Sequence, residues 1–85
     1  LYLHTLRTVN VLHGGYEYFD LVKKGIKKFE LRKDEDDIQV NDFLVLDEWN
    51  GKEYTGRYVA EQVVYVLRNA SQYGLMEGYC IIGFY

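Results

Sequence analysis

The chain has 85 residues, of which 48% are hydrophobic and 27% are charged, and this balance argues against a disordered protein. Its length suits one domain over residues 1–85 with a single small core. The net charge of −3 argues against a protein that coats nucleic acid non-specifically, because such binding depends on many Lys and Arg contacts to phosphate.

The first part of the chain predicts a strand followed by a helix. Residues 1–11 alternate as a strand in which neither face is cleanly apolar, a pattern that suits a strand beside a cleft. After a break at Gly14-Gly15, the apolar spacing of residues 16–24 indicates a short amphipathic helix. Gly25 then provides the positive φ with which many helices end.

A second strand and an acidic loop follow this helix. Residues 26–33 alternate as a strand that places its apolar side chains on one face and Glu30 and Arg32 on the other. The four consecutive acidic residues at 34–37 repel one another and predict a solvated loop. Asn41, which tolerates a positive φ, predicts a turn before the next strand.

The second half of the chain predicts three more strands. Residues 43–49 are strongly apolar, and Asn50-Gly51 predicts a hairpin that leads into a long partner strand over residues 53–67, bent at Gly56. Residues 79–85 are predicted to form the closing strand. The pattern as a whole predicts a mainly β fold of five to six strands, with one or two short helices, one of them after the first strand. So many strands in so short a chain bury their apolar face best by curling into a small barrel.

Charge is concentrated around the second predicted strand. Six of the ten Lys and Arg residues lie between Lys23 and Lys33. One interpretation is a capped helix end followed by a solvated strand face, and the other is a site that recognises an anion or a nucleobase. Glu30 indicates which of these two ligands the site would favour, because a carboxylate repels phosphate but accepts hydrogen bonds from the amino group of cytosine or adenine. Lys27 and Arg32 would hold a phosphate or carbonyl oxygen beside it, provided that Lys27 lies in the turn after the helix.

Histidine, aromatic and cysteine residues give weaker signals. His4 is more often a packed or surface histidine than a ligand, and the lack of a Cys or His cluster argues against a metal. Trp49 and Tyr54 flank the predicted hairpin, where they would either stack a base or pack across the strands. Cys80 lies in an apolar run with no second cysteine, which favours a core position in a cytoplasmic protein. No apolar run reaches the length of a membrane helix and no Gly-rich phosphate loop is present, so we expect neither membrane association nor a cofactor.

Residues 25–32 fit the pattern G-x-K-x-x-E-x-R, which resembles the signature of the ASCH domains, named for activating signal cointegrator homology. These domains belong to the PUA-like superfamily of small RNA-associated barrels. The chain also resembles a compact bacterial and phage ASCH subgroup of unknown function along nearly its whole length. Its further shared features lie at residues 4–7, 18–19, 29–33, 40–42, 46–49, 54–57 and 74–79.

The resemblance implies a PUA-like β-barrel with a cleft beside the helix, and this cleft is the expected site for RNA or a modified nucleobase. Two positions depart from the usual ASCH pattern. Asn41-Asp42 stands where a Gly-Asp turn is usual, and it keeps the option of a positive φ. Asp36 stands where an arginine is common, so the rim of the cleft becomes more acidic and phosphate binding less favourable.

The resemblance also raises an enzymatic alternative. Some ASCH proteins are amidohydrolases that act on acetylated cytidine, and in these a lysine activates a threonine three residues later. Lys27 matches that lysine, but Glu30 stands at the threonine position, and a carboxylate does not readily replace an alcohol as the acyl-accepting nucleophile. Glu30 would instead act as a general base for water, together with Lys27 and an oxyanion donor. An enzyme is therefore the less favoured hypothesis.

The leading hypothesis is a cytoplasmic ASCH domain that binds RNA or a nucleotide in a mixed-charge cleft. Lys27 and Arg32 would make charge-assisted contacts, and Glu30 would accept a hydrogen bond from an amino group. The remaining predicted site residues are Trp49 or Tyr54 as a stacking surface, with His4 and Arg7 on the opposite wall. A third alternative is a protein-interaction module that meets a partner through the acidic loop at 34–37 and the tyrosine-rich surface.

Overall fold

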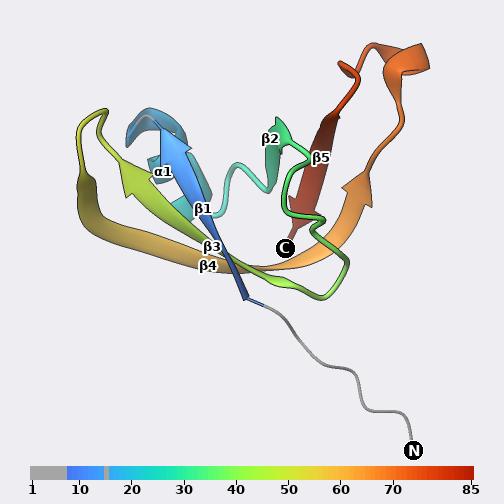
Figure 1. The fold of residues 1–85 in the computed structure, drawn as a ribbon. Coiled ribbons are helices and arrows are strands. Elements are labelled where there is room, and N and C mark those ends of the chain that lie inside the picture. Colours follow the sequence, from blue (N-terminus) through green and yellow to red (C-terminus); the bar gives the residue numbers. More distant parts are fainter. Residues whose placement is uncertain (1–7, 15) are drawn as a thin grey trace, which may run out of the picture.

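The computed structural model describes residues 8–14 and 16–85, which form a five-stranded sheet with a short helix beside it (Figure 1). In chain order the elements are β1 (Thr8–Gly14), α1 (Tyr16–Lys23), β2 (Phe29–Lys33), β3 (Phe43–Trp49), β4 (Tyr54–Leu67), the 3₁₀ turn η1 (Ser71–Tyr73) and β5 (Tyr79–Phe84). The predicted fold class, mainly β with short helices, is therefore confirmed.

Two strands differ from their predicted bounds by three residues, and β4 and β5 differ by one residue each. β1 continues to Gly14, beyond the predicted end at residue 11, because its parallel pairing with β3 runs on until Gly14 lies opposite Trp49. Residues 1–7 of the first predicted strand lie outside the described part of the chain. β2 begins at Phe29 rather than at residue 26, because the residues before it belong to the end of the helix.

The strands follow the order β1-β3-β4-β5-β2, with β1 parallel to β3 and every other pair antiparallel. β4 has 14 residues and serves both halves of the sheet. Residues 54–62 pair with β3, whereas residues 63–67 pair with β5. The sheet bends along β4 into two arms, which we call the β1–β3 arm and the β5–β2 arm (Figure 1). α1 packs against the first of these arms.

The predicted closed barrel is wrong. β1 and β2 are the two edges of the sheet, and no strand pairing joins them within residues 8–14 and 16–85. Other elements already cover the inner face that closure would bury. Val22 of α1 and Ile38 of the loop before β3 lie in the same buried cluster as Leu44 and Ile82 of the strands. The apolar face is thus buried without the strand tilt and stagger that a barrel requires.

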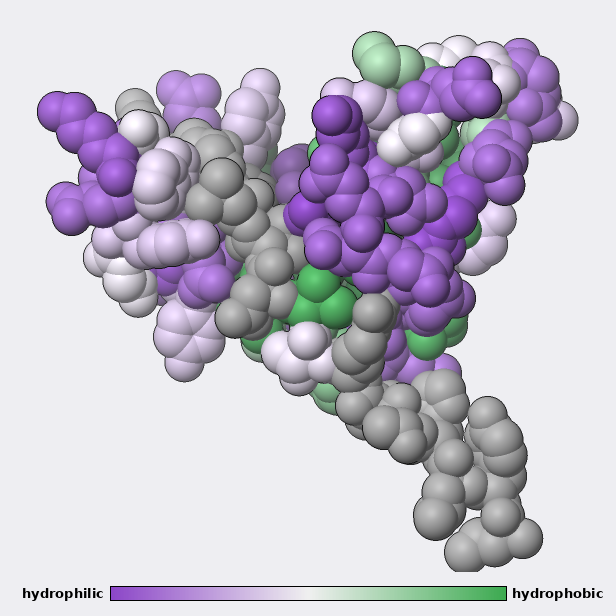
Figure 2. Space-filling view, viewed as in Figure 1, coloured by the Kyte–Doolittle hydropathy of each residue, from purple (hydrophilic) through white to green (hydrophobic). Residues whose placement is uncertain are grey.

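The core follows the two-residue period of the strands. Every second residue of β3 and of β5 is buried, and these side chains point to the inner face of both arms. On the side of the molecule in view, Figure 2 shows a small hydrophobic patch between the two arms and a mostly hydrophilic surface over the β5–β2 arm. The buried cluster comprises Val22, Ile38, Leu44, Leu46, Val63, Cys80, Ile82 and Phe84.

Three predicted turn positions have the expected backbone conformation. Asn41 has a φ of 78° in the turn before β3. Gly51, with a φ of 99°, lies in the tight connection of the β3–β4 hairpin. Gly56 has a φ of 92° near the register shift between β3 and β4. The residues that allow a positive φ therefore identified the turns correctly.

Candidate functional site

The site begins at the end of α1, where Gly25 stops the helix. Gly25 has a φ of 75°, and its N–H donates to the Val22 carbonyl at 3.0 Å. The N–H groups of Ile26 and Lys27 donate to the Leu21 carbonyl at 2.9 and 3.0 Å. The bonds from Gly25 and Ile26 form a Schellman motif, which satisfies carbonyl groups that a helix end leaves unpaired. The motif fixes Lys27 in the turn after the helix, as the recognition hypothesis requires.

Lys27 meets Glu30 across this turn. The Lys27 ammonium lies 2.9 Å from a Glu30 carboxylate oxygen. Glu30 is only 8% exposed, since it points to the inner face of β2. A carboxylate that is buried to this extent costs several kcal/mol unless a cation or hydrogen-bond donors compensate it. Lys27 supplies such a cation, so the two residues form one mixed-charge unit.

Two aromatic rings flank the Lys27 ammonium. Its nitrogen lies 5.4 Å from the ring centroid of Tyr18, on α1, and 5.4 Å from that of Phe29, at the start of β2. Both distances are within the range of a cation–π interaction. Tyr18 and Phe29 are themselves largely exposed, so the rings retain surface for a ligand. Sequence reasoning did not assign a role to either ring.

Arg32 lies on the same face of β2 as Glu30 but pairs with a different residue. Its guanidinium contacts the Asp36 carboxylate at 3.0 Å. In the ASCH pattern described above, an arginine is common at the position of Asp36. Here the Asp36 carboxylate partly neutralises Arg32, which weakens a phosphate contact by the Arg32 side chain.

The other predicted site residues lie elsewhere. Trp49 and Tyr54 pack edge to face at the hairpin, with ring centroids 5.2 Å apart and planes at 76°. In the part of the chain that the structure describes, neither ring contacts the Lys27 ammonium. His4 and Arg7 lie outside the described residues, so their predicted roles stay predictions.

A second charged cluster joins α1 to the sheet. Arg57 of β4 donates to both carboxylate oxygens of Glu48, at 3.0 and 2.7 Å, and also contacts Asp20 of α1 at 3.0 Å. The Thr55 hydroxyl donates to Glu48 at 2.7 Å, and the guanidinium lies 4.8 Å from the Phe19 ring centroid. The hydrogen bonds to Glu48 raise the pKa of Arg57 above its usual value, although desolvation acts in the opposite direction.

This cluster has a structural role, because it holds α1 against the sheet. A bidentate pair of a guanidinium and a carboxylate is among the strong charge-assisted contacts in proteins, and here it links β3 and β4 beside α1. One feature of the sequence pointed to this cluster: Glu48 occupies the next buried position after Leu44 and Leu46 in the alternation along β3. A carboxylate at a buried strand position requires a partner, but its identity depends on the β3–β4 register.

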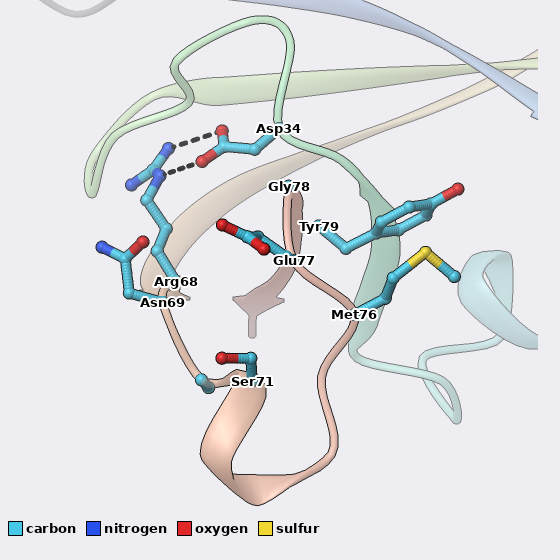
Figure 3. Close-up of a pocket in the computed structure, with 9 residues that line it drawn as sticks. Asp34, Arg68, Asn69, Ser71, Met76, Glu77, Gly78 and Tyr79 are labelled. Atoms are coloured by element: carbon cyan, nitrogen blue, oxygen red, sulfur yellow. Dashed lines mark hydrogen bonds and ion pairs between the residues drawn. The ribbon is translucent and has the colours of Figure 1, made fainter.

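A cavity of about 140 Å³ lies at the far end of the β5–β2 arm (Figure 3). Arg68 and Asp34 meet there in a two-bond ion pair at 2.6 and 3.2 Å, and Arg68 also donates to the Ile38 carbonyl. The hydrogen bond to Asp34 raises the pKa of Arg68. Burial, and next the nearby Asp34 charge, raises the pKa of the Cys80 thiol beneath, so this residue belongs to the core as predicted. Arg68, the cation that lines this cavity, is already paired with Asp34, so it is not available to attract an anionic ligand.

The described residues contain no group of three or more His, Cys, Asp or Glu side chains placed to hold a metal ion. Among these residues there is also no helix with the length and apolar character that a membrane span needs.

Residues 4–84 match a protein family that is described as a domain of unknown function, DUF3850. The chain belongs to the DUF3850 family. This DUF3850 domain is also similar to an uncharacterized 12.9 kDa protein, in the GpA 3′ region of Escherichia phage P2, with 40% identity over 47 residues. The similar region covers 55% of this chain and 43% of the phage protein, so it spans less than half of that relative. Neither description names a ligand or a reaction, and the resemblance to ASCH domains stays a prediction.

Proposed function

We propose that this DUF3850 domain recognises a nucleobase, presented by a nucleotide or by RNA. The observation that carries the proposal is the Lys27 ammonium, 2.9 Å from the Glu30 carboxylate and 5.4 Å from the centroids of the Tyr18 and Phe29 rings. A hydrogen-bond donor, an acceptor and two ring surfaces thus lie together at the end of α1. These are the groups with which proteins bind the edge and the plane of an unpaired base.

The chemistry of this unit matches a base that carries an amino group beside a carbonyl group or a ring nitrogen. The exocyclic amine of cytosine would donate to Glu30, and a carbonyl oxygen would accept from Lys27. The exposed ring of Tyr18 or Phe29 would support the plane of the base by stacking. An ammonium has three donors, so Lys27 is able to contact Glu30 and a ligand at the same time.

Charge favours a base over a phosphate as the group that is recognised. Glu30 repels an anion, and Asp36 lies 3.0 Å from the guanidinium of Arg32, the other cation on this face. The net charge of −3 acts in the same direction over the whole chain. We therefore place the phosphate groups of a ligand away from the Glu30 carboxylate.

The proposal includes kinship with the ASCH domains of the PUA-like superfamily and action in the cytoplasm. Gly25, Lys27, Glu30 and Arg32 keep the order and spacing of the ASCH signature, which supports the kinship. Cys80 is a free, buried thiol, a common feature of proteins from reducing compartments.

Nuclear magnetic resonance titration tests the nucleobase site. Cytidine, adenosine and uridine would be added to the 15N-labelled protein up to millimolar concentration. We expect cytidine to shift the amide signals of Lys27, Phe29 and Glu30, and uridine to shift them less, because it lacks the exocyclic amine. Lys27→Ala and Glu30→Gln should each weaken cytidine binding several-fold, in keeping with the loss of one charge-assisted hydrogen bond.

The matched control for this titration is Lys52→Ala, which removes an exposed lysine of the distant β3–β4 hairpin. It should leave cytidine binding unchanged. Shifts that avoid residues 27–30, or no shifts with any nucleoside, would contradict the proposal.

A second candidate function is hydrolysis of an acylated nucleoside, and one observation favours it. The 2.9 Å contact between Lys27 and Glu30 brings together two of the groups that such a reaction needs. Acetylated cytidine should then lose its acetyl group in the presence of the protein, and Lys27→Ala should abolish turnover. Intact substrate after long incubation at high protein concentration would exclude this activity.

A further inference from the structure

The outer face of the β5–β2 arm is apolar, although the outer face of an antiparallel sheet is usually polar. β2 turns Glu30 inward and leaves Phe29 and Leu31 outside, 48% and 55% exposed. Leu31 lies opposite Ile81 of β5, and Ile81 lies opposite Leu67 of β4. One complete row across the arm is therefore aliphatic. An apolar face of this kind, in which Leu31 is exposed and Ile81 and Leu67 are half-buried, indicates a binding surface.

The neighbouring row contains a slot between two rings. Gly83 of β5 lies opposite Phe29 on one side and opposite Tyr65, 61% exposed, on the other. Two strand spacings separate the backbones of Phe29 and Tyr65, about 10 Å. No ring contact joins these two side chains in the described structure. A planar group stacked between two rings needs about 3.5 Å on each side, which this spacing allows.

Backbone geometry does not require the glycine in this slot. A Cβ atom at Gly83 would lie 3.7 Å from the Tyr65 carbonyl oxygen and 4.0 Å from its Cβ, which are ordinary contacts. Its φ is not in the positive region that favours glycine. Glycine also weakens the interior of a strand, because it packs no side chain. The feature that Gly83 does provide is an open floor between the two rings.

An exposed cation at the end of β2 favours an anionic ligand for this face. Lys33 alternates with Phe29 and Leu31 on the outer face, and it is exposed and forms no ion pair within the residues that the structure describes. Asp34, the acidic residue next to Lys33, is already engaged by Arg68 at 2.6 Å. A phosphate group of a strand bound along β2 would therefore meet the Lys33 side chain.

We propose that the outer face of the β5–β2 arm binds single-stranded RNA, with one base over Gly83 between the rings of Phe29 and Tyr65. This inference rests on the proposed function and extends it from a single base to a strand. Phe29 is shared, because its ring centroid lies 5.4 Å from the Lys27 ammonium and its backbone lies opposite Gly83, the floor of the slot. Successive nucleotides would thus occupy the Lys27–Glu30 unit and the slot.

The variant Gly83→Val tests the slot directly, because it adds a side chain to the floor at a position where a Cβ atom makes only ordinary contacts. The probes are a fluorescein-labelled cytidine hexaribonucleotide, followed by fluorescence anisotropy, and free cytidine, followed by NMR. We expect Gly83→Val to weaken hexamer binding roughly five-fold or more, as for the loss of one stacked base. Cytidine binding at Lys27 and Glu30 should be unchanged, and the thermal midpoint should not fall, because valine suits a strand.

Tyr65→Ala provides a second test that adds no bulk, and it should also weaken hexamer binding roughly five-fold or more. Tyr58→Ala is the matched control, because Tyr58 is a similarly exposed tyrosine of β4 that pairs with β3 on the other arm. If both slot variants bind the hexamer like the wild type while cytidine still binds, this inference fails and the proposed function stands. If neither cytidine nor the hexamer binds, both fail. A wild-type dimer in sedimentation that Tyr65→Ala converts to a monomer would show a protein contact instead, and it would also overturn the inference.

Discussion

Three glutamates occupy inward-facing positions of the sheet, and each lies near a cation that makes its burial tolerable. Glu30 of β2 meets Lys27, and Glu48 of β3 meets Arg57. Glu61 of β4 lies opposite the buried Leu44, and the positive charge of Lys28 acts on it. Glu48 and Glu30 each have a cation in direct contact, whereas Lys28 acts on Glu61 as a nearby charge without an ion pair among the described residues. Glu61 is therefore the carboxylate for which we expect the clearest effect of pH.

Burial raises the pKa of Glu61 above its ordinary value of 4.5, and the Lys28 charge offsets only part of this effect. The folded protein therefore holds a proton at pH values where the unfolded chain has lost it. Stability must fall as the pH rises from the ordinary pKa through the raised one. We expect Glu61→Gln to be more stable than the wild type at pH 7, and this difference should vanish as the pH falls below about 4.5.

Urea unfolding at a series of pH values measures this difference. Glu53→Gln, in the exposed hairpin, is the control for the loss of one negative charge. An advantage of Glu61→Gln that is the same at pH 3 and at pH 7 would show that titration of Glu61 is not its cause.

At the scale of single elements, β2 has a pattern that the sequence revealed only in part. Alternation predicted correctly that Glu30 and Arg32 share one face and that Phe29 and Leu31 share the other. It did not show that the charged face points inward. That choice depends on Lys27 and on a loop aspartate, which reach this face only after the chain has folded.

The stacking residues illustrate the same limit. Trp49 and Tyr54, which flank the predicted hairpin, were expected either to stack a base or to pack across the strands, and they do pack against each other at the tip of the β1–β3 arm. The rings beside Lys27 are those of Tyr18 and Phe29. The Schellman motif at Gly25 brings them there, since it folds the chain back over the last turn of α1. The sequence predicted the helix end, but not the side chains that the turn would bring together.

At the scale of the whole molecule, one core joins both arms of an open sheet. The number of strands and their approximate bounds could be predicted because each depends on local alternation and turn residues. Whether the sheet closes into a barrel could not be predicted in this way. Closure depends on whether the first strand pairs with β2 or whether α1 and the loop containing Ile38 cover the inner face. The buried cluster includes Leu46 in one arm and Ile82 in the other, with Val63 of β4 between them. Such a continuous core implies that the arms unfold together.

Ile82→Ala tests whether the two arms unfold as one unit. Ile82 is fully buried in β5, so the truncation should cost about 2–5 kcal/mol of unfolding free energy, whereas Ile82→Val should cost about 0.5–1.5 kcal/mol. The single tryptophan, Trp49, lies in β3 on the opposite arm, and its fluorescence therefore reports unfolding away from the mutation. We expect the urea transition followed by Trp49 fluorescence to move as far as the transition followed by far-UV circular dichroism, because the core transmits the loss to both arms. A fluorescence transition that stays at the wild-type midpoint, while the circular dichroism signal is lost earlier, would show that the arms unfold separately.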